Sequence, residues 1–202
     1  MLKSVVIASI ALASLSLTSC DETARLAKDI QGSWCGTPER MSDDMSGTTE
    51  IVETFNFVRD TDKNGGPIII SAMISASGPL QPTDQIVQPY ALTASAEASA
   101  QGTWTAIDDD ELSVVIDPQS IEIKIDPSGI AFDTNLLTGQ ETPAIDSIRP
   151  LAASALKARL KREVMTRFLE MKHLDDVKVK KNLLRYEMGK DDFTMSRLGD
   201  IE

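Results

Sequence analysis

The stretch Thr49-Glu50-Ile51-Val52-Glu53-Thr54-Phe55-Asn56-Phe57-Val58-Arg59 (residues 49–59) decides the fold class of this chain. Its apolar and polar residues largely alternate, and a period of two is typical of a β-strand that buries one face. In this interpretation Glu53 belongs to the polar side, whereas Thr54 and Phe55 fall together on the apolar side. We therefore expect a strand with a bulge near Thr54.

Similar patterns follow on both sides of this strand, with short polar turns between them. Residues 60–66 form a turn rich in Asp, Asn and Gly, and residues 117–120 have the length of a hairpin connection. The predicted strands are 32–37, 49–59, 67–75, 90–107, 112–116, 121–125, 177–188 and 192–198.

About eight strands that pair with their sequence neighbours leave the fewest open edges when the sheet closes on itself. The sequence therefore predicts a mainly β fold, an antiparallel up-and-down barrel of about eight strands. Within it, residues 91–100 alternate alanine with small polar residues. Because alanine favours helix over strand, both structures remain open for that run.

One helix interrupts the strands near residues 148–173, before the last two of them. Its apolar residues recur at steps of three to five, the spacing of an amphipathic helix. Ser147 followed by Pro150 marks a plausible start. The helix is basic, because it contains two acids, Glu163 and Glu170, and seven cations. The cations are Arg149, Lys157, Arg159, Lys161, Arg162, Arg167 and Lys172.

The first nineteen residues have the features of an export signal. Lys3 precedes an apolar run that is too short to span a membrane as a helix. The run ends in Leu17-Thr18-Ser19-Cys20, which resembles the lipobox of bacterial lipoproteins. That resemblance implies cleavage after Ser19 and a lipid on Cys20, with acyl chains such as palmitate.

These features divide the chain into a signal peptide (1–19), a lipidated tether (20–31) and one barrel domain (32–202). They also place the protein in the cell envelope, anchored to the membrane through Cys20. The outer membrane or the cell surface is favoured over the inner membrane. The formal net charge of −11 argues against nucleic-acid binding, because phosphate backbones repel an acidic domain.

Short motifs at the two ends of the predicted barrel resemble those of lipocalins. Gly32-Ser33-Trp34 is similar to the Gly-X-Trp signature of the lipocalin first strand. Residues 102–107 and 112–115 look like middle hairpins of bacterial lipocalin-like lipoproteins, and residues 192–197 look like their last strand. The resemblance implies that Arg197 stacks on Trp34 and closes one end of the core.

Other residues with chemical potential favour structural roles. Asp60, Asp62 and Asn64 match the front half of a calcium loop, but Ser71 stands where the loop needs a bidentate Glu, so a turn is preferred. Cys35 is interpreted as a small buried residue, and His173 as a residue at the helix C-terminus. The acidic run 108–111 is interpreted as a solvated turn. We expect no cofactor, no metal and no enzymatic activity.

Two functions are compatible with these features. The first is a binding module for a small apolar or lipid-like ligand, with Ala94, Ala96, Ala98 and Ala100 leaving room inside the barrel. The second is a structural or interaction protein with a filled core, which binds a protein or anionic partner through the basic helix. The oligomeric state stays open in both.

Overall fold

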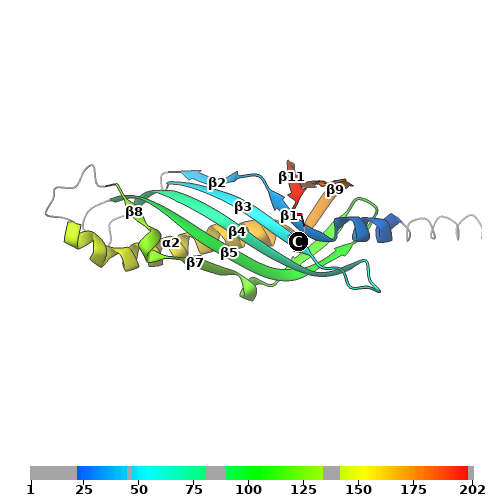
Figure 1. Ribbon diagram of the computed structural model, residues 1–202, viewed down its shortest axis with the longest axis horizontal. Helices are drawn as coiled ribbons and strands as arrows, with labels where there is room; N and C mark the ends of the chain where they lie inside the picture. Colours follow the sequence, from blue (N-terminus) through cyan, green and yellow to red (C-terminus); the bar gives the residue numbers. More distant parts are fainter. Residues whose placement is uncertain (1–21, 45–46, 81–89, 134–141, 200–202) are drawn as a thin grey trace, which may run out of the picture.

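Long antiparallel strands coil into an elongated barrel with a helix along one side (Figure 1). The computed structural model describes residues 22–44, 47–80, 90–133 and 142–199. Its elements are β1 (Gly32–Gly36), β2 (Glu39–Asp44), β3 (Gly47–Phe57), β4 (Gly65–Leu80), β5 (Tyr90–Ala106), β6 (Leu112–Ile116), β7 (Glu122–Ile125), β8 (Ala131–Phe132), α2 (Thr142–Glu170), β9 (His173–Lys180), β10 (Leu183–Met188) and β11 (Asp191–Arg197).

The barrel closes through β1, which pairs with β11 on one side and with β3 on the other. The circuit β1-β11-β10-β9-β6-β5-β4-β3 then contains eight antiparallel strands. The predicted barrel is therefore confirmed. Three strands follow α2 rather than the predicted two, because the run 177–188 turns back at Lys181, whose φ of 57° is that of a tight turn.

Beyond the closed circuit, the barrel opens. β3, β4 and β5 are 11, 16 and 17 residues long, and they extend past the shorter strands. In this open half β2 extends the sheet beside β3, while β7 and β8 pair with β5. The predicted hairpin between residues 112–116 and 121–125 is wrong. Pro118 begins a single 3-10 turn that keeps both strands in line along β5.

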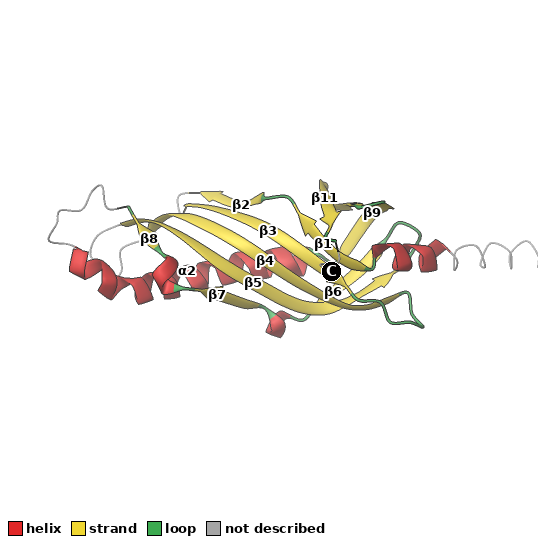
Figure 2. Cartoon of the chain, viewed as in Figure 1, coloured by secondary structure: helices red, strands yellow, loops and turns green. Residues whose placement is uncertain are grey.

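α2 covers the open half of the sheet (Figure 2). Ile148, Leu156, Leu160, Val164 and Phe168 are all buried on one helix face, with the predicted spacing. The helix begins earlier and ends earlier than the predicted 148–173, and Pro150 lies inside it rather than at its start. Accordingly His173 does not cap the helix but is the first residue of β9.

The alanine run is a strand, which settles the alternative left open for residues 91–100. Ala94, Ala96, Ala98 and Ala100 are buried on the concave face of β5, the face that α2 covers. A methyl group on this face leaves room for the larger side chains of the helix. These alanines belong to the same hydrophobic core as the buried face of α2.

Residues 22–30, which the sequence analysis placed in the tether 20–31, form a helix. Leu26, Ala27 and Ile30 belong to the hydrophobic core, and Thr23 is buried beside them. The segment therefore belongs to the folded domain. In the residues that the structure describes, none of the helices has the length and apolar character needed to cross a membrane.

Candidate functional site

The N-terminal helix closes one end of the barrel, and Trp34 and Arg197 hold it there. The Arg197 guanidinium lies 4.2 Å from the centroid of the Trp34 ring, so the structure brings together the two residues that the resemblance paired. Arg197 donates to the carbonyl oxygens of Asp29 and Gln31, each at 2.7 Å. The Trp34 indole donates to the carbonyl of Ile30, also at 2.7 Å.

These three carbonyls belong to the last turn of the helix, where backbone oxygens lack partners within the helix. Arg197 and Trp34 satisfy them, and the positive charge suits the negative end of the helix dipole. Gly32 makes this arrangement possible, because its φ is +117° and a Cβ atom there would lie 2.9 Å from an Arg197 nitrogen. The glycine of the Gly-X-Trp motif thus has a steric reason.

A partly buried ionic cluster lies between α2 and the strands β2 and β3. Arg167 of α2 donates to both carboxylate oxygens of Glu53, at 2.7 and 2.8 Å, and to Glu39 at 2.7 Å. Its guanidinium also lies 5.7 Å from the ring centroid of Phe193. We call Arg167, Glu53 and Glu39 the Arg167 cluster. It ties α2 to β2, β3 and β11.

Burial governs the electrostatics of the Arg167 cluster. Burial raises the pKa of Glu53 above its ordinary value, and the hydrogen bond and charge of Arg167 only partly oppose this. Burial lowers the pKa of Arg167, but its bonds to Glu53 and Glu39 raise it by more. The nearby Tyr186 is also buried, and this raises the pKa of its hydroxyl. The cluster therefore links α2 to the sheet, and it contains one carboxylate, Glu53, whose pKa is raised by burial.

Sequence reasoning missed Glu53, because it placed that residue on the polar side of a bulged strand. The structure has a regular strand in which Thr49, Ile51, Glu53, Phe55 and Phe57 all face inward. The predicted bulge is wrong. A strict period of two from Ile51 to Phe57 would have revealed an acid on the apolar face, and hence the need for a buried cation.

Beside the Arg167 cluster, the surface has an open hollow of about 430 Å³. Met41 of β2, Met188 of β10 and Phe193 of β11 form its apolar walls, and Arg162 and Glu170 of α2 lie on the opposite side. The hollow lies between β2, α2 and the strands β10 and β11. Most of its polar groups are on α2, whose position the cluster fixes, and Asp191 of β11 is another.

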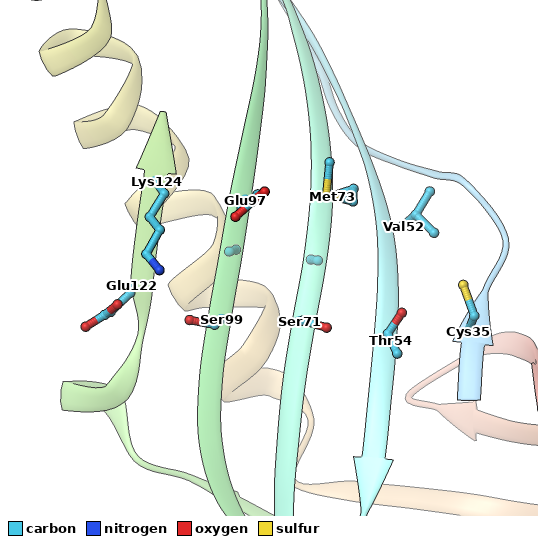
Figure 3. Close-up of a pocket in the computed structure, with 11 residues that line it drawn as sticks. Cys35, Val52, Thr54, Ser71, Met73, Glu97, Ser99, Glu122 and Lys124 are labelled. Carbon is cyan, nitrogen blue, oxygen red and sulfur yellow. The ribbon is translucent and has the colours of Figure 1, made fainter. Parts of the chain in front are cut away.

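A second hollow, of about 280 Å³, lies on the outward face of β3, β4, β5 and β7 (Figure 3). Met73, Glu97 and Lys124 line it, and α2 lies behind the sheet, on the other side. Half-buried Cys35 lies at its margin and is a free cysteine. His173 is elsewhere, with its Nδ1 3.4 Å from the Glu111 carboxylate, so the structure does not bring Cys35 and His173 together.

The acidic motifs lie in turns. Asp60, Asp62 and Asn64 belong to the turn between β3 and β4, where the Asp60 amide bonds the Gly65 carbonyl and the Asp60 carboxylate pairs with Lys63 at 3.4 Å. The run 108–111 forms the turn between β5 and β6. Within the described part of the chain, no three His, Cys, Asp or Glu side chains lie in a group that could hold a metal ion.

The outward face of α2 carries the exposed cations of the basic helix. Three of the seven cations are taken by the protein: Arg167 by its cluster, Arg149 by Asp146 and the Ile130 carbonyl, and Arg159 by Glu163 and Thr49. Four others are exposed and form no ion pair with the residues that the structure describes: Lys157, Lys161, Arg162 and Lys172.

The predicted lipidation site, Cys20, lies outside the described residues, two positions before the N-terminal helix. Comparison of the sequence with known family models and with curated proteins gives no match.

Proposed function

We propose that this chain is a non-enzymatic lipoprotein of the cell envelope, anchored through Cys20, with a filled barrel that acts through its surface. The lipobox-like run 17–20 supports the anchor. The seating of α2 supports a filled barrel, and this is the observation that carries the proposal. Where a ligand-binding barrel needs an open interior, this helix places Leu156, Leu160 and Val164 against the sheet.

Aromatic packing at the closed end supports the same conclusion. Trp34, Trp104, Phe55 and Phe57 are all among the largest side chains with less than 2% exposure. The Phe57 and Trp104 rings meet edge to face with centroids 5.5 Å apart. Rings of this size fill the width of an eight-stranded barrel.

The surface through which the protein acts is the outward face of α2. Lys157, Lys161 and Arg162 are free to pair with an anionic partner there, and Lys172 adds a charge in the turn that follows the helix. Since the rest of the chain is acidic, this cationic face gives an approaching acidic surface one preferred side. The partner is then an acidic protein or another polyanion of the envelope.

A photo-crosslinking amino acid at exposed Ala158, which lies among these cations, tests this function in cells. We expect crosslinks at Ala158 that disappear when Lys157, Lys161 and Arg162 are all changed to Gln. The matched control is the same crosslinker at exposed Ser95 on the outer face of β5. Crosslinks that persist in the triple variant, or that are equally strong at Ser95, would contradict the proposal.

Binding of a small apolar ligand is the second candidate function. It is favoured by the buried alanines of β5 beneath α2 (Ala94, Ala96, Ala98 and Ala100), which we call the alanine floor. If α2 left the sheet, the concave face of β4 and β5 would become an apolar groove. Native mass spectrometry of the full protein, released gently from membranes, distinguishes the two. A noncovalent lipid of fixed mass would favour the ligand carrier, and only covalent lipid would favour the filled barrel.

A further inference from the structure

The N-terminal helix lies close to Cys20 in the sequence. If Cys20 carries a lipid, the end of the barrel that this helix closes must therefore lie near the membrane. Only Asp21 separates Cys20 from Glu22, the first described residue of the helix. Consecutive Cα atoms are about 3.8 Å apart, so the Cα atoms of Cys20 and Glu22 are less than about 8 Å apart. A lipid on Cys20 therefore holds this end of the barrel at the bilayer surface.

The helix cannot swivel to act as a tether in its own right. Its buried face is part of the core, and Arg197 and Trp34 bind the carbonyls of its last turn. Figure 1 shows it as the dark blue helix at one end of the long axis, with its first turn directed away from the barrel. The helix therefore moves with the barrel as one body, and a lipid on Cys20 keeps this end of the barrel near the membrane.

Exposed aliphatic side chains gather at the same end. Four of the eight exposed large hydrophobic residues in the described chain lie where strands end near the helix: Val58, Ile107, Leu183 and Leu198. The strand register places them there, because Gly32 at the start of β1 lies opposite Phe57, and the Leu198 amide bonds the Ser33 carbonyl. Exposed apolar groups beside a lipid anchor fit an interfacial contact.

These four residues differ in the charged residues that lie beside them. Leu183 lies directly across from Lys180 in the β9–β10 pair, and Lys181 is in the turn between them. Leu198 follows Arg197, whose amide bonds the Asn182 carbonyl in that same turn. Ile107, in contrast, precedes the acidic run 108–111. Val58 precedes a turn in which Arg59 and Lys63 balance Asp60 and Asp62, and Lys63 pairs with Asp60 at 3.4 Å.

We propose that the Leu183 and Leu198 side of this end is a membrane-docking face for the interface of an anionic bilayer. The inference rests on the proposed lipidation of Cys20. Lys180 and Lys181 meet anionic headgroups, while repulsion of the acidic run 108–111 tilts Ile107 away from the surface. α2 runs along the long axis, so the tilt leaves its cationic face free for its own partner.

Depth-sensitive labels test the docking face on the full lipidated chain. A Cys35→Ser background carries one new cysteine, Leu183→Cys, Leu198→Cys, Ile107→Cys or Met73→Cys, labelled with an environment-sensitive fluorophore. The chain is reconstituted into vesicles that contain phosphatidylglycerol and doxyl-labelled lipid. Ile107 is the matched control, because it is 49% exposed at the same end, against 43% and 46% for Leu183 and Leu198.

We expect blue-shifted, doxyl-quenched fluorescence at positions 183 and 198, and water-like, unquenched fluorescence at 107 and 73. Changing Lys180 and Lys181 to Glu should reduce the quenching at 198. Equal quenching at 107 and 198, or none at 183 and 198, would overturn the docking face. The mass of the N-terminal peptide tests the lipidation separately, since a peptide without a lipid on Cys20 refutes the proposed anchor itself.

Discussion

At the scale of single residues, Arg197 contributes most to the closed end of the barrel. One guanidinium stacks on Trp34 and satisfies two carbonyls of the N-terminal helix. Charged hydrogen bonds of this kind stabilise more than neutral ones, because the cation faces the negative end of a helix dipole. The residue thus joins the first helix, the first strand and the last strand.

We expect Arg197→Met to lower the free energy of unfolding by about 2 kcal/mol, from the lost hydrogen bonds and cation–π contact. Urea denaturation of the full chain measures it. Arg185→Met is the matched control, because Arg185 is exposed on the neighbouring strand β10 and should change stability by less than about 0.5 kcal/mol. Equal losses in the two variants would refute the role of Arg197.

The Arg167 cluster predicts a strong single-residue effect. Arg167→Met leaves Glu53 buried without its cation, and we expect a loss of about 3 kcal/mol in the free energy of unfolding. Adding Glu53→Leu removes the stranded charge and should recover most of that loss. Arg162→Met, on the exposed face of α2, should hardly change the free energy of unfolding. A double variant no more stable than Arg167→Met would contradict this account.

The same cluster predicts a pH dependence. Folding raises the pKa of Glu53 from its ordinary 4.5, so the folded state binds this proton more tightly than the unfolded chain. The resulting stability is complete below pH 4.5 and is lost as the pH rises through the raised pKa. Wild type should therefore lose stability relative to Glu53→Gln as the pH rises. Urea denaturation across this range measures the difference, and a difference of opposite slope would show that Arg167 outweighs burial.

At the scale of elements, the fit between β5 and α2 shapes the open half of the barrel. Small side chains on the strand allow the helix to approach, and cations on the helix bind both margins of the sheet. Arg149 lies over the Phe132 ring of β8 and bonds the Ile130 carbonyl, whereas Arg159 and Arg167 bind Thr49, Glu53 and Glu39 across the sheet. The helix is therefore secured on both sides.

This fit predicts that Ala96→Leu destabilises the protein by about 1 to 3 kcal/mol, because a larger side chain on the concave face pushes against α2. Thermal and urea denaturation of the full chain measure the effect. Ser95→Leu adds a similar side chain to the outer face of the same strand and should change stability by less than about 0.5 kcal/mol. A tolerated Ala96→Leu would mean that α2 is not closely packed there.

Sequence patterns identified the longer elements that have one apolar face. The core-facing residues of β3, and the buried face of α2 from Ile148 to Phe168, carry periods that local sequence reveals. The alanines of β5 were ambiguous because their strand conformation comes from pairing with β4, which alanine propensity alone does not reveal. The N-terminal helix was missed for a similar reason, since its carbonyl partner Arg197 is 166 and 168 residues away.

At the scale of the whole molecule, the two halves of the barrel are closed in different ways, one by strand pairing and the other by a helix. β1 joins β3 to the last strand, β11, at one end, whereas α2 covers the open sheet at the other. The proposed anchor lies beside the closed end, and the cationic face of α2 extends along the other half. The central claim is that α2 is a permanent part of the core rather than a removable lid.

Hydrogen–deuterium exchange of the full lipidated protein in vesicles tests this claim most directly. If α2 is part of the core, the amides of residues 151–170 should exchange as slowly as those of β4 and β5, with or without added free lipid. The contradicting result is rapid exchange across α2 while the sheet stays protected. That result would make the helix a lid and the alanine floor beneath it a binding groove.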